Sequence, residues 1–297
     1  MASSKTNTTA PCDDVSAANP KIPITLTGVS ETMLATLAGR AQDAAKPEGQ
    51  RYLGDTWAKT VLDQLDYKRR STMTDNVFYL SILARAKQFD IWTTEFLIAH
   101  PEGVTVLHLA CGLDSRALRL NWRSPSGGKA RWIDVDMPEV IALRKKVLPD
   151  PEGDYTAMDL DVTDEAWLEE IPADRPTLVV MEGLLMYLEQ EEVMKLLRRV
   201  CERFPSGQIL ADVMGSRFLA MQSGLRTISS TGAVMKSSAD YGSELAAAHE
   251  KMRVRNEVRM WQRDGRGIFP WYLRAMLAVY SVVPGFRTIA SDMRFDF

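Results

Sequence analysis

The 297-residue sequence contains few of the residues that hold metal ions or form disulfides. Its three cysteines and three histidines are scattered and lack the spacing of a zinc site. An odd number of separated cysteines favours free thiols in a reducing compartment. We therefore expect a cytoplasmic protein with no metal. The residues concerned are Cys12, Cys111, Cys201, His100, His108 and His249.

Long hydrophobic runs and a basic excess are also missing. No stretch of about 18 apolar residues is present, which argues against a transmembrane helix. The formal net charge is −3, so neither a nucleic acid nor a membrane surface is an expected partner. Residues 1–20 are rich in Ser, Thr, Ala and Asn and lack the apolar segment of a secretory signal. We expect them to form a disordered tail.

What is present is enough apolar sequence for one large core, since 45% of the residues are hydrophobic. The pattern from Thr25 to Gln64 is helical with Gly and Pro interruptions. A stronger helical pattern follows from Asn76 to His100, with apolar residues at three- and four-residue spacing. Residues 21–100 are therefore predicted to form a helical cap, which ends at Pro101–Gly103.

Short strand-like runs then alternate with helical segments, which predicts an α/β core over residues 101–297. Pro138–Val147 and Gln190–Phe204 are the clearest helices. Buried strands separated by helices indicate a doubly wound, mostly parallel sheet. The five runs are Val104–Leu109, Arg131–Val135, Asp154–Met158, Thr177–Met181 and Gln208–Val213.

After the fifth strand, residues 215–267 are polar and Met-rich and show no strand pattern, which predicts a helical lid insertion. The segment Pro284–Ala290 could supply one more strand. Because the chain ends at Phe297, the last strand of the sheet could be missing. The lid and the N-terminal helices would form the pocket for a second ligand and control access to it.

The loop Leu109–Arg116 follows the first strand and is the first candidate site. Ligands of doubly wound sheets bind beyond the carboxyl ends of the strands, and small residues let the backbone approach them closely. Gly112 is a true glycine, whereas Ala110 stands where many nucleotide-binding turns have their first glycine. A plain βα turn explains the pattern equally well.

Three carboxylates follow the next strands. Asp136 could accept hydrogen bonds from ribose hydroxyls, or it could cap the helix that begins at Pro138. Asp159 could bind an adenine amino group or lie in a solvated acidic turn. Glu182 stands between apolar residues, where a charge is usually paired or functional, and it would suit a cationic ligand.

Together these pieces resemble the leucine carboxyl methyltransferase family. That family includes enzymes that methylate the C-terminal leucine of protein phosphatase 2A, and bacterial and fungal O-methyltransferases of polyketide biosynthesis. The resemblance covers about Asn76 to Val213. It rests on Arg85 with Asp90, on Leu-Ala-Cys-Gly-Leu-Asp-Ser-Arg116, on Val-Asp-Met-Pro-Glu-Val140, on Asp159-Leu160 and on Glu182-Gly-Leu-Leu-Met-Tyr-Leu188.

The resemblance implies a seven-stranded class I methyltransferase sheet with S-adenosyl-L-methionine as methyl donor and S-adenosyl-L-homocysteine as product. Arg85 would bind the carboxylate of the donor's methionine part and Glu182 would lie near its amino group. Ala110 and Gly112 would approach the same part through the backbone. The loop reads Ala-Cys-Gly where the family usually has Gly-Ala-Gly, which puts the donor affinity in question.

The adenosine part of the donor would, by the same resemblance, lie over the second and third strands. Asp136 would bind the ribose hydroxyls. Asp159 and Leu160 would hold the adenine, the first by a hydrogen bond and the second by packing.

The sequence offers no obvious general base, which favours a carboxylate or an acidic hydroxyl as methyl acceptor. His108 lies inside the first strand and is best interpreted as a core residue. Tyr187 is the candidate catalytic residue, because it could orient the acceptor, although packing explains it equally well.

Three functions remain open. The favoured one is an O-methyltransferase for a small molecule of secondary, polyketide-type metabolism. The second is a carboxyl methyltransferase for the C-terminal leucine of a phosphatase. The third is a protein that binds the donor without transferring its methyl group, as a cyclisation catalyst or binding module.

Overall fold

The computed structural model describes residues 20–24, 29–67, 76–164, 166–224, 233–263 and 268–297. The expected disordered tail, apart from Pro20, lies outside these residues. Among the described residues, no helix combines the length and the apolarity that a bilayer crossing requires.

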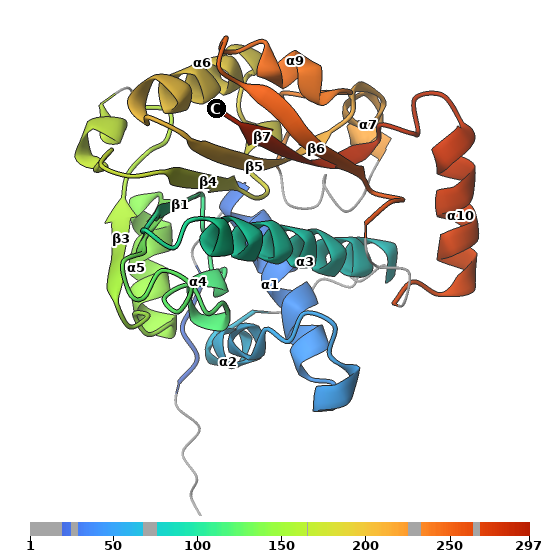
Figure 1. The fold of residues 1–297 in the computed structure, drawn as a ribbon. Helices are drawn as coiled ribbons and strands as arrows, with labels where there is room; N and C mark the ends of the chain where they lie inside the picture. The colour runs from blue at the N-terminus through green and yellow to red at the C-terminus, as the bar shows by residue number, and fades with distance from the viewer. Residues whose placement is uncertain (1–19, 25–28, 68–75, 165, 225–232, 264–267) are drawn as a thin grey trace, which may run out of the picture.

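A seven-stranded sheet with the order β3-β2-β1-β4-β5-β7-β6 forms the centre of the molecule (Figure 1). The first five strands are parallel and β7 is antiparallel to both of its neighbours. The strand order reverses between β1 and β4, where a doubly wound sheet opens its ligand crevice. The strands are β1 Thr105–Leu109, β2 Arg131–Asp136, β3 Asp154–Asp159, β4 Thr177–Met181, β5 Gly207–Met214, β6 Arg253–Arg259 and β7 Ala290–Asp296.

Helices cover both faces of the sheet. On one face α6 buries Val193, Leu196 and Val200 in a core with β1, β4 and β5. On the other face α3 packs Phe89 and Phe96 against the same strands. The helices are α1 Val29–Ala44, η1 Glu48–Gln50, α2 Thr56–Gln64, α3 Asn76–Ala99, α4 Arg116–Arg119, α5 Pro138–Val147, η3 Trp167–Glu170, η4 Leu185–Tyr187, α6 Gln190–Arg203, α7 Ser216–Met221, η5 Gln222–Gly224, α9 Gly242–Ala246 and α10 Trp271–Val282.

The predicted strands and core helices agree with the structure to within two residues. Their signal is strong because β1 and β4 are buried along their whole length and therefore read as continuous apolar runs. The helix α5 begins at Pro138, whose fixed φ suits the first helical position.

The N-terminal helical segment differs in detail from the prediction. The pattern from Thr25 to Gln64 divides into α1 and α2, which Pro47 and a short 3-10 turn separate. The two helices pack on each other and on Leu113 of the loop after β1. The long helix α3 is part of the sheet's cover as well as of the predicted cap.

The seven-stranded sheet was predicted correctly, but one expectation about the C-terminal part was wrong. The segment 215–267 contains short helices, but it also contains the strand β6. This strand was not recognised because it is an edge strand with four exposed residues and three arginines, the composition that protects an edge from pairing with other chains.

The last strand is not missing. β7 extends to Asp296 and pairs with seven residues of β5, so the strand begins where the expected segment Pro284–Ala290 ends. Its pattern alternates apolar and polar residues, and here the polar residues Asp292 and Arg294 are buried in ion pairs. Buried polar side chains hide the strand from a hydrophobic pattern.

Candidate functional site

The predicted site residues meet at the carboxyl edge of the parallel strands. The strand register places Leu109 of β1 beside Val135 of β2 and Met181 of β4, and Asp136 beside Asp159. The residues that follow these strands therefore surround one region at the crossover between β1 and β4.

The turn after β1 has an unusual backbone. Ala110 has φ +50° and Gly112 has φ +52°, so both lie in the left-handed region that disfavours a Cβ atom. A Cβ atom on Gly112 would lie 3.0 Å from the side chain of Met33 on α1. The close approach and the backbone angle both explain this glycine.

The thiol of Cys111 is buried at the centre of the turn. Burial raises the pKa of Cys111 well above its usual range, so the thiol stays neutral and behaves as a small apolar group. Cys111 and Cys201 are both free thiols, as predicted, while Cys12 lies outside the described residues.

Asp136 is held by two backbone hydrogen bonds, and Met137, not Asp136, is the N-cap residue of α5. The Asp136 carboxylate accepts hydrogen bonds from the backbone N–H of Gly112, at 2.7 Å, and from that of Met137 at the start of α5, at 2.8 Å. Burial raises the pKa of Asp136, although both hydrogen bonds oppose the shift. Each carboxylate oxygen keeps a lone pair for a ligand hydroxyl.

The loop after β3 lies beside Asp136. The Leu160 N–H donates to the Asp136 backbone carbonyl at 3.0 Å, and the Leu160 side chain packs against the sheet's core. Asp159 is exposed at the end of its strand. Its carboxylate is therefore accessible to a ligand at this edge.

Arg85 lies between two carboxylates. From α3 its Nε donates to Glu182 at 3.0 Å and its Nη1 donates to Asp212 at 2.7 Å. Asp212 also accepts the N–H of Gly183, which has φ +74°, at 2.6 Å. The structure thus brings Arg85 and Glu182 together in an ion pair that was not predicted, and adds Asp212 from β5.

Glu182 accepts from a second arginine, Arg116, at 2.6 Å. Burial alone would raise the pKa of Glu182, but Arg85 and Arg116 overcome this effect and lower it to about 2. The carboxylate therefore stays ionised throughout the neutral range.

These pairs belong to one buried network of four arginines and five carboxylates. It connects the helical cap to the loop Leu109–Arg116, which we call the donor loop, and to the end of β4. If all of these groups are ionised, the five carboxylates exceed the four arginines by one negative charge. They are Arg40, Arg85, Arg116, Arg119, Asp55, Asp90, Asp114, Glu182 and Asp212.

His108 is a core residue, as interpreted from the sequence. It is buried, and its Nδ1 lies 3.2 Å from the carboxylate of Asp134. Trp132 and Arg144 donate to the same carboxylate. These contacts hold the imidazole inside the sheet. We therefore assign His108 no role in proton transfer.

Tyr187 ends the 3-10 turn that follows Glu182. It is half-buried, and burial raises its pKa, whereas a hydrogen bond with Thr32 of α1 lowers it. Met33, the next residue of α1, covers Gly112. The helix α1 therefore bridges the loops after β1 and β4.

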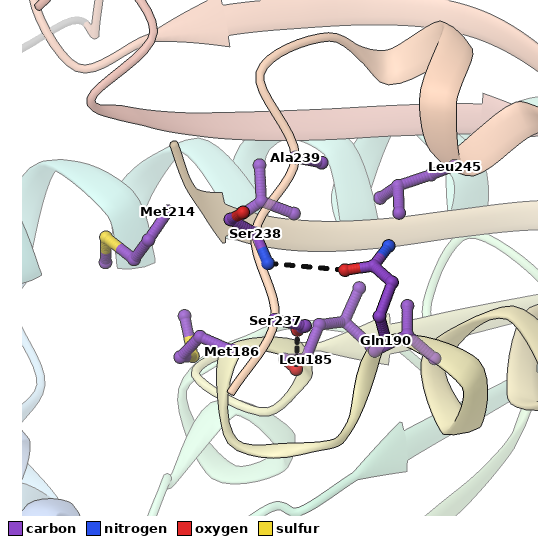
Figure 2. A pocket seen from close by; sticks show the side chains of 10 residues that line it. Leu185, Met186, Gln190, Met214, Ser237, Ser238, Ala239 and Leu245 are labelled. Carbon is purple, nitrogen blue, oxygen red and sulfur yellow. Dashed lines mark hydrogen bonds between the residues drawn. The ribbon is translucent and has the colours of Figure 1, made fainter. Parts of the chain in front are cut away.

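A small pocket of about 10 Å³, with room for about one water molecule, lies next to this turn, between η4, the end of β5 and the segment before α9 (Figure 2). Ser237 donates to the Leu185 carbonyl at 2.6 Å, and the Ser238 N–H donates to Gln190 at 3.4 Å. The lining residues are Leu185, Met186, Gln190, Val193, Val213, Met214, Ser237, Ser238, Ala239 and Leu245.

Two residues of the site were missed by sequence reasoning. Asp212 interrupts the apolar strand β5, and a charge in a buried strand is a signal that could have identified it. Arg116 was read only as the end of the donor loop. It is 0% exposed, and nothing in the sequence indicated that its partner would be Glu182.

Comparisons with known proteins identify the family to which the chain is similar. The model of the family described as leucine carboxyl methyltransferase matches residues 33–201. The tetracenomycin polyketide synthesis O-methyltransferase TcmP of Streptomyces glaucescens is 42% identical over 191 residues, which cover 64% of this chain and 68% of TcmP. The S-adenosyl-L-methionine-dependent methyltransferase dpfgK of Gibberella zeae is 40% identical over 210 residues, covering 65% of this chain and 68% of dpfgK.

Among solved structures, a methyltransferase candidate from Thermobifida fusca YX has a similar fold. The TM-score is 0.56 at 15% identity, and the match covers 91% of this chain and 94% of the other.

Proposed function

The chain belongs to the leucine carboxyl methyltransferase family of S-adenosylmethionine-dependent methyltransferases, and we propose that it methylates an oxygen atom of a small polyketide-type molecule. The observation that carries this proposal is the similarity to TcmP, whose name describes an O-methyltransferase of polyketide synthesis. The similarity extends over 191 residues.

The amino-acid part of the donor would lie at the end of β4. Arg85 Nη2 has no hydrogen-bond partner among the described residues, so it is free to bind a carboxylate, and Glu182 is placed to accept from an ammonium group. The excess negative charge of the buried network suits a sulfonium cation.

The adenosine part would lie over β2 and β3. Asp136 has lone pairs for the ribose hydroxyls, and its backbone bonds to Gly112 and Met137 fix its position. Asp159 and Leu160 would hold the adenine at the neighbouring strand end. Ala110 and Gly112 would let the turn after β1 approach the donor closely.

When bound, the donor supplies an activated methyl group that an oxygen nucleophile takes by in-line displacement. The protein's residues then have to align the two reactants and exclude water. Met33 and Thr32 of α1 cover the edge of the site and would serve the exclusion of water.

No free general base is found among the described residues that surround the edge. His108 is held by Asp134, and Tyr187 has a raised pKa and would serve to orient the acceptor. An acceptor that is already ionised, such as a carboxylate or an acidic phenol, fits this arrangement best.

The test is methyl transfer from S-adenosylmethionine with an isotope-labelled methyl group to a panel of aromatic polyketide phenols, aromatic carboxylates and peptides that end in leucine. Mild base separates the products, because it releases methanol from a methyl ester and leaves an ether intact. We expect a labelled small-molecule product.

Transfer only to the leucine peptides would contradict the small-molecule proposal and favour protein carboxyl methylation. Donor binding without transfer to any acceptor would favour a binding module. The variant Tyr187→Phe is expected to retain transfer and to raise the KM for the acceptor.

A further inference from the structure

We propose that Asp212 is a positioning residue that fixes Arg85 for the amino-acid part of the methyl donor. The inference rests on the proposed donor site, in which Arg85 binds the donor carboxylate. Asp212 lies on β5, outside the loops that carry the other donor contacts, and no role was expected for it from the sequence.

Asp212 holds two parts of the site with one carboxylate. Its Oδ2 accepts from Arg85 Nη1 at 2.7 Å and its Oδ1 accepts from the Gly183 N–H at 2.6 Å. Its side chain is 1% exposed, so water does not compete for these bonds. Charge-assisted hydrogen bonds of this kind are the strong ones, and they hold the guanidinium and the turn after β4 in a fixed relation.

The backbone that carries this carboxylate is held by its place in the sheet. β5 pairs with β4 on one side and with β7 on the other, and Asp212 lies opposite Asp292. Arg85, in contrast, has a long side chain that could adopt several rotamers. A fixed partner on a central strand limits that freedom before the donor arrives.

The contacts also select which edge of the guanidinium stays free. The fork of Arg85 presents its donors in a rigid plane. Glu182 occupies Nε and Asp212 occupies Nη1, which leaves Nη2 near the α-carbon of Gly183, where an added Cβ atom would lie 3.8 Å away. The free edge is therefore directed at the turn where the donor's carboxylate would bind.

Glu182 cannot supply this function alone. It shares its charge between Arg85 and Arg116, at 3.0 and 2.6 Å. Within the described residues, Asp212 has Arg85 as its only ion-pair partner. Removing the charge of Asp212 would therefore affect Arg85 specifically.

The test compares two ligands that differ in the amino-acid part. S-adenosylhomocysteine has this part, whereas 5′-methylthioadenosine has the adenosine and the sulfur without it. In calorimetric titrations, Asp212→Asn is expected to weaken the affinity for S-adenosylhomocysteine by about 10- to 100-fold and to leave that for 5′-methylthioadenosine unchanged. Asparagine keeps an oxygen for the Gly183 N–H, which favours a folded variant.

Asp43→Asn is the matched control. Asp43 is a buried aspartate on α1 that accepts from Lys46 and from the Leu53 N–H, and it lies outside the ion pairs of Arg85. The ratio of the two affinities is expected to stay at the wild-type value in this control. An equal loss for both ligands in Asp212→Asn would identify a general structural role and overturn the inference, as would no loss for either ligand.

A double-mutant cycle tests whether Asp212 acts through Arg85. In the Arg85→Met background, Asp212→Asn is expected to cause no further loss of S-adenosylhomocysteine affinity. The double variant also removes both charges of the pair, so it remains testable where the single variant fails to fold. An undiminished effect of Asp212→Asn in that background would contradict the inference. A wild-type protein that binds both ligands equally well would instead refute the proposed donor site.

Discussion

Glu182 lies between Arg85 and Arg116, and this position makes its ionisation depend on the fold. The arginines lower its pKa from an ordinary 4.5 to about 2 in spite of its burial. A carboxylate with a lowered pKa stabilises the folded state above its unfolded pKa, and the contribution disappears as the pH falls through the folded pKa.

Glu182→Gln is therefore expected to lower the free energy of unfolding by about 3 kcal/mol at pH 7. Because Glu182 of the unfolded chain takes up a proton below about pH 4.5 while folded Glu182 stays ionised down to about pH 2, the difference between the two proteins should shrink over that range. Urea titrations of both proteins at pH 7, 5 and 3 measure this difference in the free energy of unfolding. A difference that stays constant with pH would contradict the assigned ion pairs.

Ala110 is the only described residue other than glycine with a positive φ, at +50°. A Cβ atom costs roughly 1–2 kcal/mol in this conformation, and part of the gain from removing it is offset by the entropy of glycine in the unfolded chain. Ala110→Gly is expected to raise the free energy of unfolding by about 1 kcal/mol. Ala117→Gly, in helix α4, is the control and should lower it by a similar amount. A destabilised Ala110→Gly variant would argue against strain in the turn.

At the scale of the elements, the closure of the sheet is most sensitive at the start of β5. A Cβ atom on Gly207 would lie 1.9 Å from the backbone oxygen of Thr177 on β4 and 2.9 Å from the ring of Phe297. Gly207 therefore marks the point where β4, β5 and the end of the chain meet.

Gly207→Ala is expected to destabilise the protein by about 3 kcal/mol, because the overlap is with backbone that cannot move aside. Gly49→Ala is the matched control, since an added Cβ atom there meets nothing within 4 Å. Thermal unfolding of the two variants compares them directly. Equal melting temperatures would show that β4 and β5 can separate to accept the added methyl group, and would contradict this prediction.

The elements also show where sequence patterns succeed and fail. The strands β1, β2, β4 and β5 were predicted because burial from both faces makes them apolar. β6 and the extent of β7 were missed, since an exposed edge strand and a strand with buried ion pairs both look polar in sequence. Periodicity detects burial of apolar groups, and it does not detect burial of paired charges.

At the scale of the whole molecule, the cap and the donor loop are coupled by charge. Arg40 on α1 donates to Asp55, the N-cap of α2, at 3.1 Å and to Asp114 of the donor loop at 2.7 Å. Loss of one partner of a buried pair is strongly destabilising because it leaves the other charge without compensation.

Arg40→Met is accordingly expected to weaken S-adenosylhomocysteine binding and to increase amide hydrogen exchange in α1, in α2 and in the loop after β1. Exchange should stay unchanged in β4 and β5. Arg131→Met, which removes surface ion pairs with Asp154 and Asp174, is the control and should have little effect. Unchanged exchange in the donor loop of Arg40→Met would exclude the coupling.

The candidate site was only partly predictable for the same physical reason. The order of strands and helices placed Asp136, Asp159 and Glu182 at one edge, because parallel strands end on the same side. Glu182, which pairs with Arg85 and Arg116, and Asp212, which pairs with Arg85, are far from these arginines in the chain and meet them only in the folded sheet. No local pattern carries that information.

The central claim is that the carboxyl edge of this sheet binds S-adenosylmethionine, and calorimetric titration of S-adenosylhomocysteine tests it most directly. Wild type is expected to bind one molecule per chain. Asp136→Ala is expected to bind at least about tenfold more weakly while it keeps the wild-type circular dichroism spectrum. Absence of binding to wild type, or equal binding to both proteins, would contradict the account.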